Sequence, residues 1–191
     1  FDRQYMQNPL NERNLLYKPF GEYETLPTLN MRKGYIDTAD KGDDFLFAAA
    51  YGLPQDPDDD FIYIIDMLYS DESMEVTEPL TIDFINRNEL NQVDIESNNG
   101  GRGFARVVKQ GTPNTAINDF HQSANKESRI ISNSATVNRR LVFPINWKHR
   151  WPEVYEHLRT FKRIFKSNAT DDPEDGLTGV LEKSQYEFWS I

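Results

Sequence analysis

Three apolar runs joined by short polar turns dominate the first part of the chain. Residues 34–37, 45–52 and 61–70 are rich in aliphatic and aromatic side chains, and the prolines and aspartates of 54–60 are typical of a turn. Consecutive strands that are joined by short turns pair antiparallel. The pattern therefore predicts an antiparallel meander of three strands.

Helical and strand-like segments alternate in the rest of the chain. Apolar spacing and helix-start residues predict helices at 77–90, 100–111, the start of 125–137, 151–165 and 172–189. Short apolar runs predict further strands at 92–97, 115–122 and 141–144. Mixing of this kind indicates an α/β domain whose mixed β-sheet is flanked by helices.

The first 30 residues carry no clear period and contain Pro9, Pro19 and Pro27. We interpret residues 1–30 as a lead-in or linker and 31–191 as one domain, because 191 residues suffice for a single core. The chain begins with phenylalanine, so we expect it to be a piece of a longer protein. It contains no run of about 18 apolar residues, and we expect no membrane span.

The residue types that are present restrict the chemistry. The chain has no cysteine, which excludes disulfides, thiolate zinc sites and thiol nucleophiles. The histidines lack the spacing of a metal-binding pair, so a metal would be held by oxygen ligands, which favours Mg²⁺, Mn²⁺ or Ca²⁺. A net charge of −10 argues against a general polyanion-binding surface. The argument is partial, because a nuclease site is itself acidic before metal binds and positive charge can be local.

Carboxylates stand at the ends of three predicted elements. Asp37 ends the first strand, Glu96 ends a later one, and Asp171, Asp172 and Asp175 open the last helix. If these groups converge, their mutual repulsion raises their pKa values. Two divalent cations roughly 3.5–4 Å apart relieve that repulsion and form a hydrolytic site. Taken singly, each acid has a simpler explanation, as a turn residue, a surface acid or a helix cap.

The segments around these acids carry a resemblance. "GYIDTADKGDDF", "DIESNNGGRGFARVV", "NKESRI" and "DDPEDGLTGVLE" follow one another in order from Gly34 to Glu182. In this order they resemble the C-terminal nuclease domain of the large terminase subunit of tailed bacteriophages. The resemblance implies an RNase H-like fold, in which parallel strands extend the antiparallel meander. It also implies an endonuclease that cuts concatemeric double-stranded DNA during genome packaging with two Mg²⁺ or Mn²⁺ ions.

The resemblance also assigns metal ligands by position. Asp37 is the first ligand and bridges both ions, and Glu96 is the second. The third ligand comes from Asp172 and Asp175, with the closer of the two left open, and Asp171 is the weaker candidate. Three cations are candidates for contacts with DNA phosphates: Arg102, Lys126 and Arg129. That they are ordinary surface cations is an equally good explanation.

The partners that the resemblance implies are the terminase ATPase domain, the small terminase subunit and the portal protein, in the cytoplasm of a bacterial host. The chain contains no GxxxxGK[ST] phosphate loop. We therefore expect the ATPase domain to be absent from this chain, and we attribute neither ATP hydrolysis nor DNA translocation to it.

Two alternative functions stay open. The acidic balance suits a docking module for portal or motor partners with little cleavage of its own. The same fold suits an RNase H-like resolvase of branched DNA. The helix predicted at 151–165 is also rich in cations that could follow a DNA backbone, and a solvated helix face is the simpler explanation.

Overall fold

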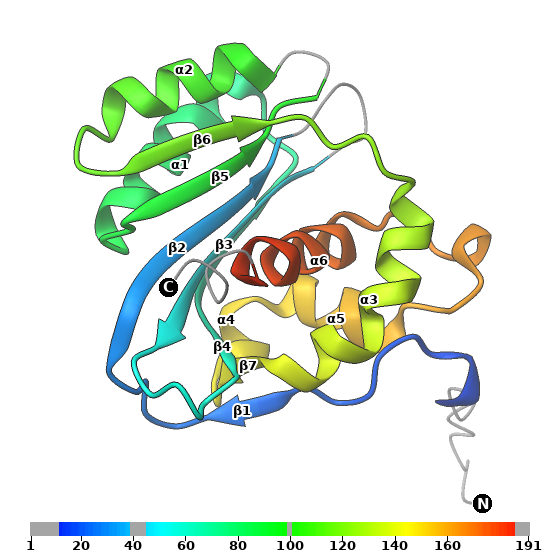
Figure 1. The fold of residues 1–191 in the computed structure, drawn as a ribbon. Coiled ribbons are helices and arrows are strands. Elements are labelled where there is room, and N and C mark those ends of the chain that lie inside the picture. Colours follow the sequence, from blue (N-terminus) through cyan, green and yellow to red (C-terminus); the bar gives the residue numbers. More distant parts are fainter. Residues whose placement is uncertain (1–11, 39–44, 99–100, 186–191) are drawn as a thin grey trace, which may run out of the picture.

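A seven-stranded mixed sheet forms the centre of the computed structural model, which describes residues 12–38, 45–98 and 101–185 (Figure 1). Its order is β1-β7-β4-β3-β2-β5-β6. The strands are β1 (Gly21–Tyr23), β2 (Leu29–Asp37), β3 (Leu46–Pro54), β4 (Ile62–Ser70), β5 (Gln92–Glu96), β6 (Ala116–Phe120) and β7 (Leu141–Pro144). Strands β2, β3 and β4 pair antiparallel, and the other neighbours pair parallel. The predicted meander and mixed sheet are confirmed.

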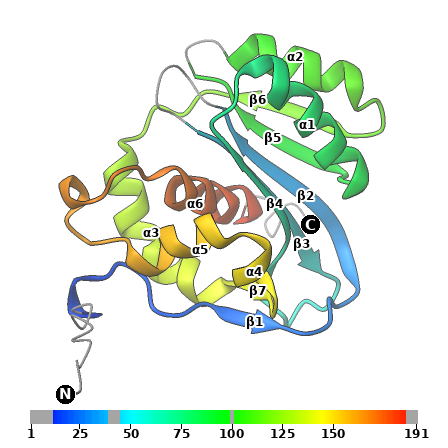
Figure 2. The same ribbon diagram turned by 180° about the vertical axis from the view of Figure 1, so that it is seen from behind.

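Helices cover both faces of this sheet (Figures 1 and 2). One face carries α1 (Met74–Arg87) and α2 (Gly101–Gly111). The other carries α3 (Lys126–Arg140), α4 (Trp147–Arg150), α5 (Pro152–Thr160) and α6 (Asp172–Gln185). Two short 3-10 turns, Glu12–Asn14 and Phe165–Ser167, complete the described elements. Within the described residues, no helix combines the length and the apolar character that a membrane crossing requires.

Side-chain alternation along the central strands separates two apolar cores. In β2, Tyr35 packs with side chains of α6, whereas Ile36 packs with side chains of α1 and α2. Successive side chains of a strand point to opposite faces, so Asp37 projects to the same face as Tyr35. The alternation therefore directs a carboxylate toward α6 at the end of a buried strand.

The segment predicted as a lead-in is part of the fold from residue 12 onward. Strand β1 pairs in parallel with β7, and Leu16 and Tyr17 are buried in the core on the α6 face. Strand β1 has three residues, which is too short to show an alternation of apolar and polar side chains, and its partner lies far along the chain. The local sequence therefore does not reveal the pairing. Residues 1–11 of the lead-in, and 186–189 of the last predicted helix, lie outside the described residues.

Three predicted helices have different bounds in the structure. Helix α3, which was predicted only for the start of 125–137, continues to Arg140. Helix α1 begins and ends three residues before its predicted limits. The helix predicted at 151–165 stops at Thr160. The reason is Asn168, whose Oδ1 accepts from Lys162 N at 2.8 Å and whose Nδ2 donates to Lys162 O at 2.9 Å. Such bonds give the backbone an alternative to the helix, and residues 161–170 form a loop.

Helix α6 lies unusually close to the sheet because two of its residues are glycines. A Cβ atom at Gly176 would overlap the ring of Phe47, and one at Gly179 would overlap the ring of Tyr35. Both rings are fully buried, so neither has free space to move into. The glycines therefore set the distance between the first turn of α6 and the ends of β2 and β3.

We expect Gly179→Ala to lower the free energy of unfolding by about 1–3 kcal/mol, because overpacking outweighs the higher helix propensity of alanine. Denaturant titration measures the change. The matched control is Gly103→Ala in α2, where an added Cβ meets nothing within 4 Å. The control is expected to be neutral or stabilising by up to about 1 kcal/mol. Equal stability of the two variants would contradict the close packing of α6.

Candidate metal centre

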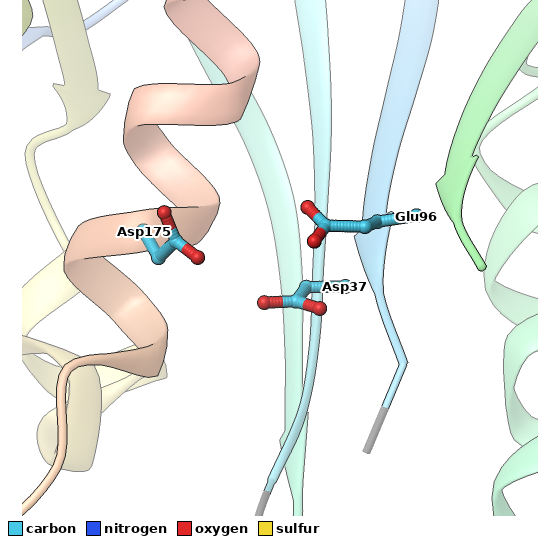
Figure 3. Close-up of side chains that lie close together, drawn as sticks. All are labelled: Asp37, Glu96 and Asp175. Atoms are coloured by element: carbon cyan, nitrogen blue, oxygen red, sulfur yellow. The ribbon is translucent and has the colours of Figure 1, made fainter. Parts of the chain in front are cut away.

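Three carboxylates from separate elements converge at one end of the sheet. Asp37 is the last residue of β2, Glu96 is the last residue of β5, and Asp175 lies in the first turn of α6. One oxygen of each lies within 4.8 Å of the other two. Figure 3 shows the carboxyl group of Asp175 facing those of Asp37 and Glu96 across the gap between helix and sheet. The sequence predicted that Asp37 and Glu96 meet an acid from the start of the last helix, with Asp172 and Asp175 left open, and the structure brings Asp175 together with the two strand-end acids.

The register of two parallel strands explains the pairing of Asp37 with Glu96. Strands β2 and β5 are neighbours, and Asp37 lies directly opposite Glu96. The preceding residues Ile36 and Ile95 are also opposite each other, and both are buried in the core under α1 and α2. Two equally phased strands that end in acids therefore place both carboxylates on the α6 face.

Hydrogen bonds hold the carboxylate of Glu96 in one orientation. The hydroxyl of Tyr35 donates to its Oε2 at 2.7 Å, and Nδ2 of Asn98 donates to its Oε1 at 2.6 Å. Partners of this kind orient metal-binding carboxylates. Sequence reasoning missed Tyr35 because a buried tyrosine in a strand looks like core. The usable signal was its position two residues before Asp37, which places both side chains on one face.

The pKa shifts show that the site disfavours uncompensated negative charge. Burial raises the pKa of Asp37 well above its usual range, and the charges of Glu96 and Asp175 act in the same direction. Burial also raises the pKa of Asp175 to about 6, although the cations Lys126 and Arg129 oppose that rise. A divalent cation would relieve both effects, since it favours the charged form of each carboxyl group.

One oxygen atom in the cluster has an incomplete set of partners. Oδ2 of Asp175 is buried and accepts no hydrogen bond from a described residue, and the ammonium of Lys126 lies 3.5 Å away. Buried polar atoms without a hydrogen bond are rare and call for an explanation such as an ion. Three carboxylate oxygens at this spacing match the oxygen ligands that Mg²⁺ and Mn²⁺ prefer.

Asp172 is not one of the three acids whose oxygens converge, and its Oδ1 lies near a cation. The ammonium of Lys126 lies 3.0 Å from Oδ1 of Asp171 and 4.0 Å from Oδ1 of Asp172. Burial lowers the pKa of Lys126, but the charges of Asp175, Asp171 and Asp37 outweigh this effect and raise that pKa. Of the two candidates that the sequence left open, the structure brings Asp175 into the group with Asp37 and Glu96, and it leaves Asp172 beside Lys126.

The candidate DNA-binding cations differ in their surroundings. Arg102 is exposed in the first turn of α2, and Lys126 is half-buried. Arg129 is buried, and its guanidinium donates to Oδ1 of Asp175 at 3.0 Å and to Oε2 of Glu182 at 2.9 Å. Its donors point at carboxylates of α6, so the structure gives Arg129 a role in positioning Asp175. A contact between Arg129 and DNA stays a prediction that its burial opposes.

The family described as "Terminase Bacteriophage T7, Ribonuclease H-like domain" matches residues 36–141, which is more than half of the chain. The chain belongs to this terminase family. The matched segment starts one residue before Asp37 and contains Glu96, and the resemblance in sequence to terminase nuclease domains is confirmed. No curated protein matches the chain in sequence.

Solved structures of terminase nuclease domains share the fold. The nuclease domain of the large terminase g2p from bacteriophage SPP1, with bound Mn, is 14% identical, with 88% of this chain and 98% of that chain covered and a TM-score of 0.60. The large terminase nuclease from thermophilic phage G20c, with bound zinc, is 15% identical, with 90% and 95% covered and a TM-score of 0.56. The predicted RNase H-like fold of this terminase domain is therefore confirmed.

Proposed function

We propose that this terminase domain is a divalent-metal-dependent endonuclease that hydrolyses phosphodiesters of concatemeric double-stranded DNA. The observation that carries the proposal is the convergence of Asp37, Glu96 and Asp175 within 4.8 Å of one another. Membership of the terminase family supports a nuclease as the class of activity. Bound Mn in the SPP1 domain and bound zinc in the G20c domain support a divalent cation as the cofactor.

Asp37, Glu96 and Asp175 would hold one cation, and Asp172 beside Asp175 is our candidate for completing a two-ion site with Mg²⁺ or Mn²⁺. When bound, such ions lower the pKa of an attacking water and stabilise the charge that develops on the phosphodiester. Neighbouring protein residues orient the carboxylates and compensate their negative charge. Tyr35 fixes the carboxylate of Glu96, and the cations near α6 offset its acids. Placement on strand ends and a helix keeps the ligands in a fixed geometry.

We also propose the setting in which the domain works. Its substrate is double-stranded DNA, and its partners are the terminase ATPase domain, the small terminase subunit and the portal protein, in the cytoplasm of a bacterial host. The proposed nuclease unit includes residues 12–30 as well as 31–185, because β1 pairs with β7. Family membership supports the partners, and the missing phosphate-loop motif supports assigning ATP hydrolysis to another domain.

Cleavage of supercoiled plasmid tests the proposal. We expect nicked and linear products with Mn²⁺ or Mg²⁺ and none with a chelator, because three carboxylates without a metal ion do not lower the pKa of a water molecule. Cleavage that persists in chelator would contradict a metal-dependent site. Absence of cleavage in every divalent metal would favour the docking alternative, which the net charge of −10 supports.

A further inference from the structure

A basic, exposed loop lies beside the carboxylate site. Residues 161–170, between α5 and α6, contain three cations and no acid, in a chain whose net charge is −10. Lys162, Arg163 and Lys166 are exposed, and none of them forms an ion pair with a described residue. Many other surface cations face an acid, as Arg87 does with Asp66 at 2.9 Å. The loop therefore presents net positive charge that nothing in the described fold neutralises.

Hydrogen bonds to a second segment hold the loop in place and add another cation. Leu16 N donates to Phe161 O at 2.8 Å, and Arg163 N donates to Asn14 O at 2.9 Å. Asn168 closes the loop from within through its two bonds to the backbone of Lys162. These contacts bring the chain at Arg13 alongside, and Arg13 is exposed too. A charged loop that is braced in this way loses little conformational freedom when it binds.

A hollow lies between the loop and the start of α6. It has a volume of about 260 Å³. Its lining runs from the loop to the start of α6 and consists of Lys126, Phe161, Phe165, Asn168, Ala169, Thr170, Asp171 and Asp172. Lys126 and Asp171 also belong to the ion-pair cluster around Asp175. In Figure 1 the loop is the orange turn between α5 and α6, and it leads directly into α6. The basic loop therefore lies next to the helix turn that carries Asp175, and Lys126 and Asp171 link the two.

We propose that this loop is a binding surface for the sugar–phosphate backbone of the DNA duplex, with Arg163 and Lys166 contacting phosphates beside the one that is cut. The inference rests on the proposed nuclease function and names residues that would position its substrate. An acidic domain repels a polyanion, so local cations next to the site have to supply the attraction. The cations stand on a braced loop with one 3-10 turn and not on the helix face that the sequence predicted.

The test compares two matched double variants in duplex binding. Arg163→Gln with Lys166→Gln removes two charges from the loop. Arg106→Gln with Lys109→Gln removes the same residue types from exposed positions of α2 on the opposite face of the sheet. Fluorescence anisotropy of a labelled duplex in chelator measures binding without cleavage.

We expect the loop variant to bind roughly tenfold more weakly near 100 mM salt. We also expect its slope of log affinity against log salt to become shallower by about 2, one for each lost phosphate contact. The α2 variant is expected to match wild type. Thermal unfolding checks that both fold. Arg13→Gln with Lys162→Gln, which removes one loop cation and the cation of the neighbouring segment, should also weaken binding.

Equal binding by the two double variants would overturn the proposal. Unchanged duplex binding by the loop variant would overturn it as well. The binding partner of the basic loop would then be an acidic protein surface. Failure of the nuclease proposal has a different signature. Wild type would then bind duplex through the loop in chelator, yet cut no plasmid in any divalent metal.

Discussion

Replacing Asp37 by asparagine is expected to reduce metal-dependent DNA cleavage by at least about 100-fold while the fold is retained. Asparagine keeps the shape of the side chain and removes the negative charge that faces Glu96 and Asp175. Loss of one of three anionic ligands weakens cation binding, and the remaining pair holds the ion less firmly. Initial rates of plasmid nicking at fixed Mn²⁺ measure the change, and circular dichroism checks the fold.

Asp119→Asn is the matched control for this experiment. Asp119 is an exposed residue near the end of β6, a strand that neighbours β5, and the substitution changes the net charge by the same amount. The control is expected to cleave like wild type. Retained cleavage by Asp37→Asn would falsify the assignment of Asp37, and an equal loss in the control would point to a general effect of charge.

The second large effect is a reversal of stability order on metal addition. In chelator at pH 8, Asp37→Asn is expected to unfold at a higher temperature than wild type. With saturating Mn²⁺, wild type is expected to unfold at the higher temperature. A metal at 100 times its Kd stabilises the folded state by about 2.7 kcal/mol, or roughly 5–10 °C in Tm at this chain length. Thermal unfolding of both proteins, with and without Mn²⁺, measures the reversal.

The sign of the pH dependence follows from the raised pKa of Asp37. Because burial and neighbouring charges raise its pKa in the folded state, the folded protein favours the protonated carboxyl group. The stability contribution of this group is present below the unfolded value of 3.8 and is lost as pH rises through the folded-state pKa. Asparagine is neutral at every pH, so in chelator the advantage of Asp37→Asn should shrink as pH falls toward 4. An advantage that grows toward low pH would contradict the raised pKa of Asp37.

The two strand-end acids of the site were predictable from the apolar pattern of their strands. Asp37 and Glu96 each end an apolar run, and parallel neighbours in equal phase must bring such ends together. The choice between Asp172 and Asp175 was not predictable, because residues three apart on a helix share a face. Packing determines which of the two lies with the strand-end acids: Gly176 lets α6 approach Phe47 of β3, and Asp175 comes within 4.8 Å of Asp37 and Glu96.

The parts of the fold that the sequence hid depend on distant partners. Strand β1 is defined by its pairing with β7, and no local period reveals it. The segment after α5 was predicted to stay helical, and backbone bonds to a distant segment hold it as a loop: Leu16 N donates to Phe161 O at 2.8 Å, and Arg163 N donates to Asn14 O at 2.9 Å. Tertiary contacts of this kind override local preference. The contacts of Arg129 were hidden in the same way, since only the fold shows that its guanidinium faces Asp175 and Glu182.

Anomalous scattering from crystals soaked in Mn²⁺ tests the central claim most directly, because it locates the ion without reference to activity. The account predicts a peak within bonding distance of carboxylate oxygens of Asp37, Glu96 and Asp175. A strongest peak elsewhere on the domain, with none among these three carboxylates, would contradict it.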